Sequence, residues 1–281
     1  MSRPATTLLA ALLAFALTGC GGSSGPSGLL QETSDNLGDI RSGDLTLRLL
    51  VEGGGKQAGF ELKGRFALAD EGELPVAELD YTQIAGDHEE TITLISTGKK
   101  AFVAMGDDVY ELPERQTANL RSAGGEVSGD SGLGTLEIGG WLIEPRVSDG
   151  GEVGGAETDR IHANLDVVRA ANDILALVAG LDGSKATHLE GRNAEQLRAA
   201  TKSATIDVYT GKDDHLLRRL VIDARLGASV PAKLRERLGD LSKARLTFEL
   251  GIADPNGDVE IEEPERAKPQ PSVHWKPGAG S

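Results

Sequence analysis

Residues 44–51, DLTLRLLV, alternate between polar and apolar side chains and predict a β-strand with one buried face. Side chains of a strand point alternately to its two sides. One side of this strand would carry Leu45, Leu47, Leu49 and Val51. Residues 60–68 repeat the pattern, with Gly64 at a point where a bulky side chain would not fit. Two such strands joined by the glycine-rich stretch 53–55 predict an antiparallel pair.

The same period of two recurs along most of the chain. Further strands are predicted at residues 76–84, 90–97, 100–105, 109–112, 204–210, 216–226 and 245–253. Short glycine-containing turns at residues 98–99 and 106–108 make the neighbouring strands antiparallel. Between the two groups of strands the period changes to that of a helix.

Two helices are predicted in this middle region. Asp166 would cap a helix from Val167 to Ala179, with Gly180 as a left-handed stop. A second helix would start at Asn193 in a capping-box arrangement and run to about Lys202. A weaker helical pattern covers residues 114–123. The strands outnumber the helices, so residues 29–264 are expected to form a single sheet-dominated domain. The proline-rich tail, residues 265–281, is expected to be disordered.

Cys20 is the only cysteine among the 281 residues, and it follows Leu17-Thr18-Gly19 and an apolar run from Leu8. With Arg3 ahead of that run, residues 1–19 have the parts of an export signal, and the run is too short to span a bilayer. The ending in small residues and a cysteine resembles the lipobox of bacterial lipoproteins, in which the cysteine becomes the acylated first residue. The sequence therefore predicts lipid attachment at Cys20 and a location on the extracytoplasmic face of the cell membrane.

Residues 21–28, GGSSGPSG, have the composition of a flexible linker between this anchor and the domain. The formal net charge is −15, and removal of residues 1–19 would take away one basic and no acidic residue. A chain this acidic is not expected to bind nucleic acid or to adhere to anionic lipid through charge. No intramolecular disulfide can form, so the core must hold the fold.

Motifs for catalysis, metals and cofactors are weak. Residues 129–132, GDSG, match the surroundings of a serine protease nucleophile, but no histidine occurs in a matching context. The turn at residues 254–258 carries alternating oxygen ligands, and a hairpin turn at Asn256-Gly257 explains it, with weak calcium binding as the alternative. Asp213-Asp214 is interpreted as solvated surface charge. No metal site, cofactor or enzymatic activity is predicted.

The layout as a whole resembles a known group of lipoproteins. The features that carry the resemblance are Cys20, the antiparallel meander, the segment Trp141-Leu142-Ile143, a short strand leading into a helix over residues 161–179, and a terminal strand at 246–253 followed by residues 256–264, NGDVEIEEP. These features resemble the LppX/LprA/LprF/LprG lipoproteins, whose fold is similar to that of the carriers LolA and LolB. The resemblance implies the α+β class: a strongly curved antiparallel β half-barrel with helices covering the concave face, around an apolar cavity that holds acylated lipid.

The residues at which a ligand would touch such a cavity follow from the apolar strand faces and from the first predicted helix. They are Leu45, Leu47, Phe60, Leu62, Ile92, Leu94, Val103, Ile174 and Val178. Aromatic residues make up only 4% of the chain, so the walls would be mainly aliphatic. The same positions could equally fill an ordinary core, because apolar strand faces usually pack against something.

Two functions follow from these two alternatives. An open cavity would make the protein an anchored lipoprotein that binds an acylated lipid or glycolipid for transport or presentation at the cell envelope, with a membrane transporter as a partner. A filled core would make it an anchored accessory protein whose acidic surface contacts a membrane protein.

Overall fold

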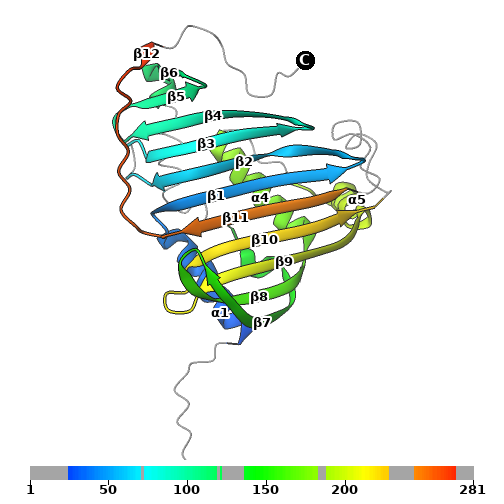
Figure 1. The fold of residues 1–281 in the computed structure, drawn as a ribbon. Coiled ribbons are helices and arrows are strands. Elements are labelled where there is room, and N and C mark those ends of the chain that lie inside the picture. Colours follow the sequence, from blue (N-terminus) through cyan, green and yellow to red (C-terminus); the bar gives the residue numbers. More distant parts are fainter. Residues whose placement is uncertain are drawn as a thin grey trace, which may run out of the picture.

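One large antiparallel sheet dominates the computed structural model (Figure 1). The structure describes residues 25–70, 73–118, 121, 136–182, 188–227 and 244–269, with the backbone alone for 177–182. The strands are β1 Ser42–Gly53, β2 Lys56–Ala67, β3 Val76–Ala85, β4 His88–Thr97, β5 Ala101–Met105, β6 Asp108–Glu111, β7 Leu142–Val153, β8 Ala156–Leu165, β9 Thr201–Gly211, β10 Leu217–Leu226, β11 Arg245–Ala253 and β12 Lys268–Pro269. The helices are α1 Pro26–Asp35, the 3-10 turn η1 Asn36–Asp39, α3 Ile138–Trp141, α4 Val167–Asp182 and α5 Gly191–Ala200, and residues 114–118 are also helical.

The strands pair in the order β12-β6-β5-β4-β3-β2-β1-β11-β10-β9-β8-β7. All neighbours are antiparallel except the short pair β6 and β12. The sheet has two separate ends, so it is an open half-barrel, and it curves with α4 on one side of it (Figure 1). The predicted α+β class, with a curved antiparallel sheet and helices on its concave side, is confirmed.

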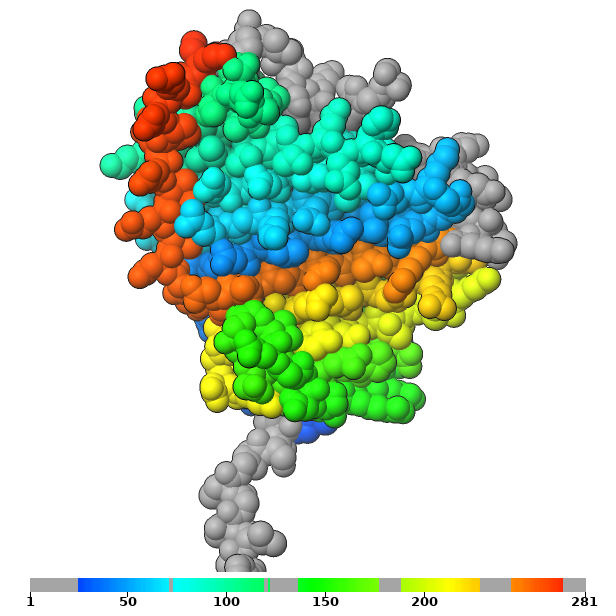
Figure 2. Space-filling view, viewed as in Figure 1, coloured from blue at the N-terminus to red at the C-terminus, as the bar shows by residue number. Residues whose placement is uncertain are grey.

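The two faces of the central strands differ in chemistry. Leu47 marks the concave face, and directly opposed residues of neighbouring strands share its side. Its row runs through Leu62, Tyr81 and Ile92 in one direction and through Leu250, Leu220, Val208 and Ile161 in the other. The convex face, seen in Figure 2, carries ion pairs such as Arg48–Glu61 and Arg219–Glu249. Alternation therefore places an apolar surface toward the helices and a charged surface toward solvent.

One of the convex ion-pair groups shows how the charges are held. The Asp207 carboxylate accepts hydrogen bonds from Arg160 Nε and His162 Nδ1, both at 2.8 Å. Burial disfavours the charged form of Asp207, but these hydrogen bonds outweigh it and hold its pKa below the ordinary value. The cluster ties β8 to β9 on the outer surface and keeps these three charged groups off the apolar face.

Gly64 lies where the sheet admits no side chain, as predicted. Its φ of +145° is one that residues other than glycine rarely adopt, and a Cβ placed there would lie 2.0 Å from the carbonyl oxygen of Glu78. Gly59 on the same strand has a similar contact, 2.0 Å from the carbonyl oxygen of Leu49. These two glycines let β2 approach both neighbouring strands closely.

Several predicted boundaries were wrong. Helix α4 continues through Gly180 to Asp182, so Gly180 is not a stop. Helix α5 begins at Gly191 without a side-chain cap, and Lys202 already belongs to β9. Asp166 does cap α4 as predicted, because its Oδ1 accepts hydrogen bonds from the backbone N–H groups of Val168 and Arg169.

Five elements were not predicted at all: α1, η1, α3, β7 and β12. Helix α1 starts at Pro26, inside the segment interpreted as a linker, because proline is well suited to the first turn of a helix. Strand β7 lacks a regular alternation and was missed. The GDSG motif, Cys20 and residues 1–24 lie outside the residues that the structure describes.

The C-terminal segment, residues 254–269, runs along one side of the molecule past the strand ends (orange to red in Figures 1 and 2). It leaves β11 through a turn in which the Asn256 side chain accepts a hydrogen bond from the backbone N–H of Arg41 at 2.8 Å. It ends at β12, which lies inside the predicted disordered tail, and Lys268 Nζ is 2.5 Å from Asp108 Oδ1 there. Residues 265–269 are thus ordered against β6, which corrects that prediction.

Candidate functional site

The apolar face of the sheet divides into a covered half and an open half. On β8 to β10, Ile161, Ile206, Val208 and Leu220 are each 0% exposed. On β1 to β5 the predicted cavity residues have higher exposure. Leu94 is 38% exposed, and the half-buried positions are Leu45, Leu47, Phe60, Leu62, Ile92 and Val103. One continuous apolar surface is therefore packed at one end and accessible at the other.

The covered half is filled by the N-terminal helices and by α3. Leu30 of α1, Leu37 of η1, and Ile138 and Trp141 of α3 belong to the same buried cluster as the strand residues of β8 to β11. Their side chains replace water over this half of the face, so no ligand is needed there. This half is therefore a filled core, which is one of the two alternatives that the sequence analysis gave.

Helix α4 is fastened over the sheet by its first turns. Trp141 Nε1 donates a hydrogen bond of 2.6 Å to Asp173 Oδ2, and the Asn172 side chain accepts one of 2.7 Å from the backbone N–H of Leu189. These contacts join α4 to α3 and to the chain that leads into α5. Because Trp141 and Asp173 come from different elements, this pair fixes the position of α4.

Beyond these anchors, the inner side of α4 faces the accessible region. Ile174 is half-buried and packs against the same cluster as Leu45 and Leu47, whereas Leu175 is 38% exposed. The structure thus brings three predicted cavity residues into one contact group. The side chain of Val178 lies outside the described part of the structure.

The remaining predicted residues form the open half, together with several that the sequence analysis missed. Phe60, Leu62, Ile92, Leu94 and Val103 share the concave face with Leu79 and Tyr81. The rings of Phe60 and Tyr81 stack with centroids 6.1 Å apart. Leu79 and Tyr81 belong to the alternation of residues 76–84, so the same signal could have identified them.

Met105 marks the far end of the open half. It lies at the end of β5, on the side that Val103 also faces, and it is 44% exposed. Leu94, directly opposite Val103, is exposed beside it. We call Leu94 and Met105 the open end of the apolar face, because both are large apolar side chains that are exposed on the concave side.

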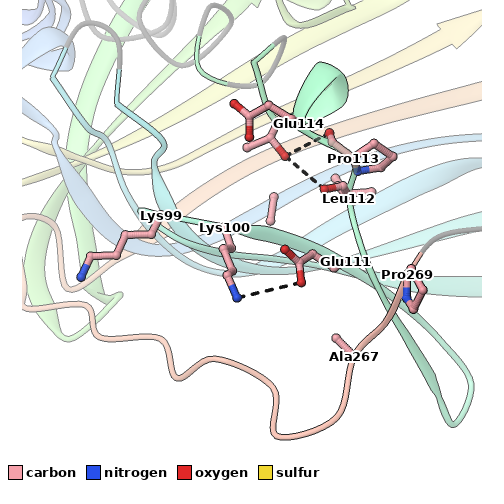
Figure 3. Close-up of a pocket in the computed structure, with 10 residues that line it drawn as sticks. Lys99, Lys100, Glu111, Leu112, Pro113, Glu114, Ala267 and Pro269 are labelled. Atoms are coloured by element: carbon pink, nitrogen blue, oxygen red, sulfur yellow. Dashed lines mark hydrogen bonds and ion pairs between the residues drawn. The ribbon is translucent and has the colours of Figure 1, made fainter.

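A separate cleft of about 520 Å³ lies beneath the C-terminal segment (Figure 3). It is lined by Lys99, Lys100, Ala101, Glu111, Leu112, Pro113, Glu114, Thr117, Ala267 and Pro269. Lys100 Nζ lies 2.7 Å from Glu263 and 3.9 Å from Glu111, and the hydrogen bond to Glu263 raises the pKa of Lys100. None of the predicted cavity residues lines this cleft, whose ion pairs serve to hold the C-terminal segment.

The charged groups outside this cleft form local ion pairs. Within the described ranges, no group of three or more His, Cys, Asp or Glu side chains could hold a metal ion. Asp214 is not simple surface charge, because its Oδ2 lies 2.6 Å from Nη2 of Arg218, whose side chain is only 6% exposed. This ion pair corrects the earlier interpretation of Asp214 and stabilises the turn between β9 and β10.

Replacing Trp141 with phenylalanine should loosen α4. The change keeps most of the buried ring but removes the hydrogen bond to Asp173, at a cost of about 1 to 2 kcal/mol. Amide hydrogen exchange should therefore accelerate over residues 167–176, measured by mass spectrometry. Arg169→Met is the matched control, since Arg169 joins α4 to α3 only through an exposed 3.4 Å contact with Gly140, and its other ion pair, with Asp166, stays at the start of its own helix. Equal exchange in both variants would show that this hydrogen bond does not position α4.

No helix in the described ranges is long and apolar enough to cross a membrane.

Comparisons with known proteins concern the fold. The structure is similar to the crystal structure of LprF from Mycobacterium bovis, with 12% sequence identity, 85% of this chain and 96% of that chain covered, and a TM-score of 0.48. A complex of Pseudomonas aeruginosa MucA and MucB matches with 10% identity over 82% of this chain and 59% of that chain, at a TM-score of 0.27. MucB in complex with MucA(peri) matches with 10% identity over 81% and 56%, at 0.26. No family model and no curated protein matches the sequence. LprF is one of the lipoproteins that the sequence resembles.

Proposed function

We propose that this protein binds the acyl chains of a lipid or glycolipid against the open half of its apolar face. In this proposal it works as a lipoprotein anchored through Cys20 on the extracytoplasmic face of the cell membrane, and it carries or presents its ligand at the envelope. The observation that supports lipid binding is the unequal burial of one apolar surface. Ile161 and Val208 are fully buried, while Leu94, on the same face, is 38% exposed.

Physical chemistry favours an acyl chain as the occupant. The open half is lined mainly by aliphatic and aromatic side chains, and the Arg48–Glu61 ion pair of the same strands lies on the opposite face of the sheet. Burying one chain of about sixteen carbons is worth on the order of 10 kcal/mol before the costs of binding. That is enough for a ligand to remain bound during purification.

The most direct test of this function uses two adjacent residues on opposite faces. Leu62→Asn places an amide on the open half, and Lys63→Asn places the same group on the convex side of the same strand. We expect Leu62→Asn to weaken binding of a fluorescent palmitate analogue at least about tenfold, which corresponds to about 1.4 kcal/mol. Lys63→Asn should bind like the parent protein. Equal affinity for all three proteins would contradict binding at this face.

A larger side chain in the open half should prevent lipid from binding there. Leu94→Trp adds volume at a half-exposed position, so we expect loss of bound lipid, measured by mass spectrometry of solvent extracts, with little change in melting temperature. Leu47 packs against the core, and Leu47→Trp should cost about 1 to 3 kcal/mol by overpacking. If neither the parent nor any variant carries lipid and Leu94→Trp is also destabilised, the accessory-protein alternative with a filled core is favoured.

A further inference from the structure

Strand β7 exposes aliphatic side chains that the fold does not use. Ile143 is 48% exposed and Val147 is 41% exposed. The exposed Arg146 lies between them in the sequence, and its side chain forms no ion pair with another described residue. Ile143 and Arg146 oppose Asn164 and His162 on the convex side, whereas Val147 opposes Ile161 on the concave side. The two aliphatic side chains thus lie on the two faces of the edge strand, where contact of that edge with a bilayer would bury both and bring the guanidinium to the phosphates.

Strand pairing does not explain this surface. β7 is the last strand of the sheet, but its register shifts between Ile143 and Arg146 and again between Asp149 and Gly151. Glu144 has a φ of +55° and is followed by Pro145, which lacks a backbone N–H. Such bulges and prolines protect an edge strand from pairing with another strand. The exposed side chains are therefore expected to contact something other than another β-strand.

The position of the predicted anchor points to a membrane. Helix α1 packs against β7 at the same end of the sheet (Figure 1). The chain from Cys20 to Pro26 can span at most about 20 Å. Acylation of Cys20 would hold the start of α1, and β7 beside it, within that distance of the bilayer.

The open end of the apolar face lies at the other end of the sheet. β5 and β7 are separated by the strands from β4 through β8, a path of roughly 40 Å at about 4.8 Å for each strand. Figure 1 shows β5 and β7 at opposite ends of the molecule. Contact of β7 with the membrane would thus turn Leu94 and Met105 away from it.

We infer that the α1–β7 end rests on the bilayer that holds the anchor, with Ile143 and Val147 in the interface, and that the lipid site opens away from this bilayer. The inference rests on the proposed function, because it requires acylation of Cys20. Lipid would then be exchanged with a carrier, a membrane protein or a second membrane.

Site-specific labelling of the full-length acylated protein tests this orientation. Acylation consumes the thiol of Cys20, so Ile143→Cys, Val147→Cys and Met105→Cys each introduce one free thiol for an environment-sensitive NBD label. The proteins are reconstituted in vesicles of phosphatidylethanolamine and phosphatidylglycerol that contain brominated lipid. We expect blue-shifted, quenched emission from labels at 143 and 147, and unshifted, unquenched emission from the label at 105.

The possible outcomes separate the inference from the proposed function. Quenching at 105 but not at 143 or 147 would overturn the orientation and place the open end on the anchoring bilayer. No quenching at any position, with protein that still floats with the vesicles, would overturn the contact of β7. A parent protein whose Cys20 accepts the label, or that does not float with vesicles, would instead refute the anchor itself.

Discussion

Replacing Gly64 with valine is expected to lower the free energy of unfolding by about 4 kcal/mol or more, and it could prevent folding altogether. The backbone at Gly64 has a φ of +145°, and any Cβ would lie 2.0 Å from the carbonyl oxygen of Glu78. The obstacle is backbone, so no side chain can rotate out of the way. Urea denaturation followed by circular dichroism measures the effect, and a surviving fold should show a widened spacing between β2 and β3.

Gly38→Ala is the matched control for this variant. Gly38 lies in η1, where a Cβ would have no neighbouring atom within 4 Å, and its φ is not in the positive region. Its replacement should leave stability unchanged or raise it by up to about 1 kcal/mol. If the two variants were equally stable, the strands around Gly64 could separate without cost, and the close approach would not contribute to stability.

Replacing Cys20 with serine should abolish membrane attachment. Each acyl chain of about sixteen carbons contributes on the order of 10 kcal/mol to membrane binding, and serine cannot form the thioether that carries it. Parent protein should partition into the detergent phase of Triton X-114, and the variant should appear in the aqueous phase or remain as uncleaved precursor.

The control for the anchor moves the thiol without removing it. A double change, Cys20→Ser with Ser23→Cys, keeps a cysteine in the same glycine- and serine-rich stretch but outside the Leu17-Thr18-Gly19 context. It should behave like Cys20→Ser. A mature amino terminus at any residue other than Cys20 would contradict the lipoprotein interpretation.

The sequence was most informative where local chemistry determines structure. Alternation in residues 44–51 and 60–68 located β1 and β2 and placed Leu45, Leu47 and Leu62 on one face, because the period of a strand depends only on its own residues. The sequence did not predict α1, because Pro26 stands among glycines and serines. It did not predict β7, because Asp149-Gly150-Gly151 interrupts the alternation of that strand. Both elements owe their structure to contacts with distant parts of the chain.

The division of the apolar face could not be predicted in the same way. Leu47 and Leu220 occur in similar alternating contexts, yet Leu47 is half-buried and Leu220 is 0% exposed. The difference comes from α1 and α3, which cover one half of the face through contacts far apart in the sequence. Sequence pattern therefore identified the candidate surface, and only the fold showed which part of it is accessible.

The pairing of β1 with β11 has a consequence for how the protein matures. Asp44 is paired with Ala253, so the strand that begins the meander finds its second neighbour only when nearly the whole chain is present. Strands β1 to β6 can pair as successive hairpins, but the leading edge of β1 stays bare until residues 245–253 arrive. A chain that crosses a membrane from its amino terminus would thus join the two halves of its sheet at the centre only near the end, shortly before β12 pairs with β6 at the edge. Until that moment the two halves of the apolar face are not joined, so ligand loading should begin only after translocation ends.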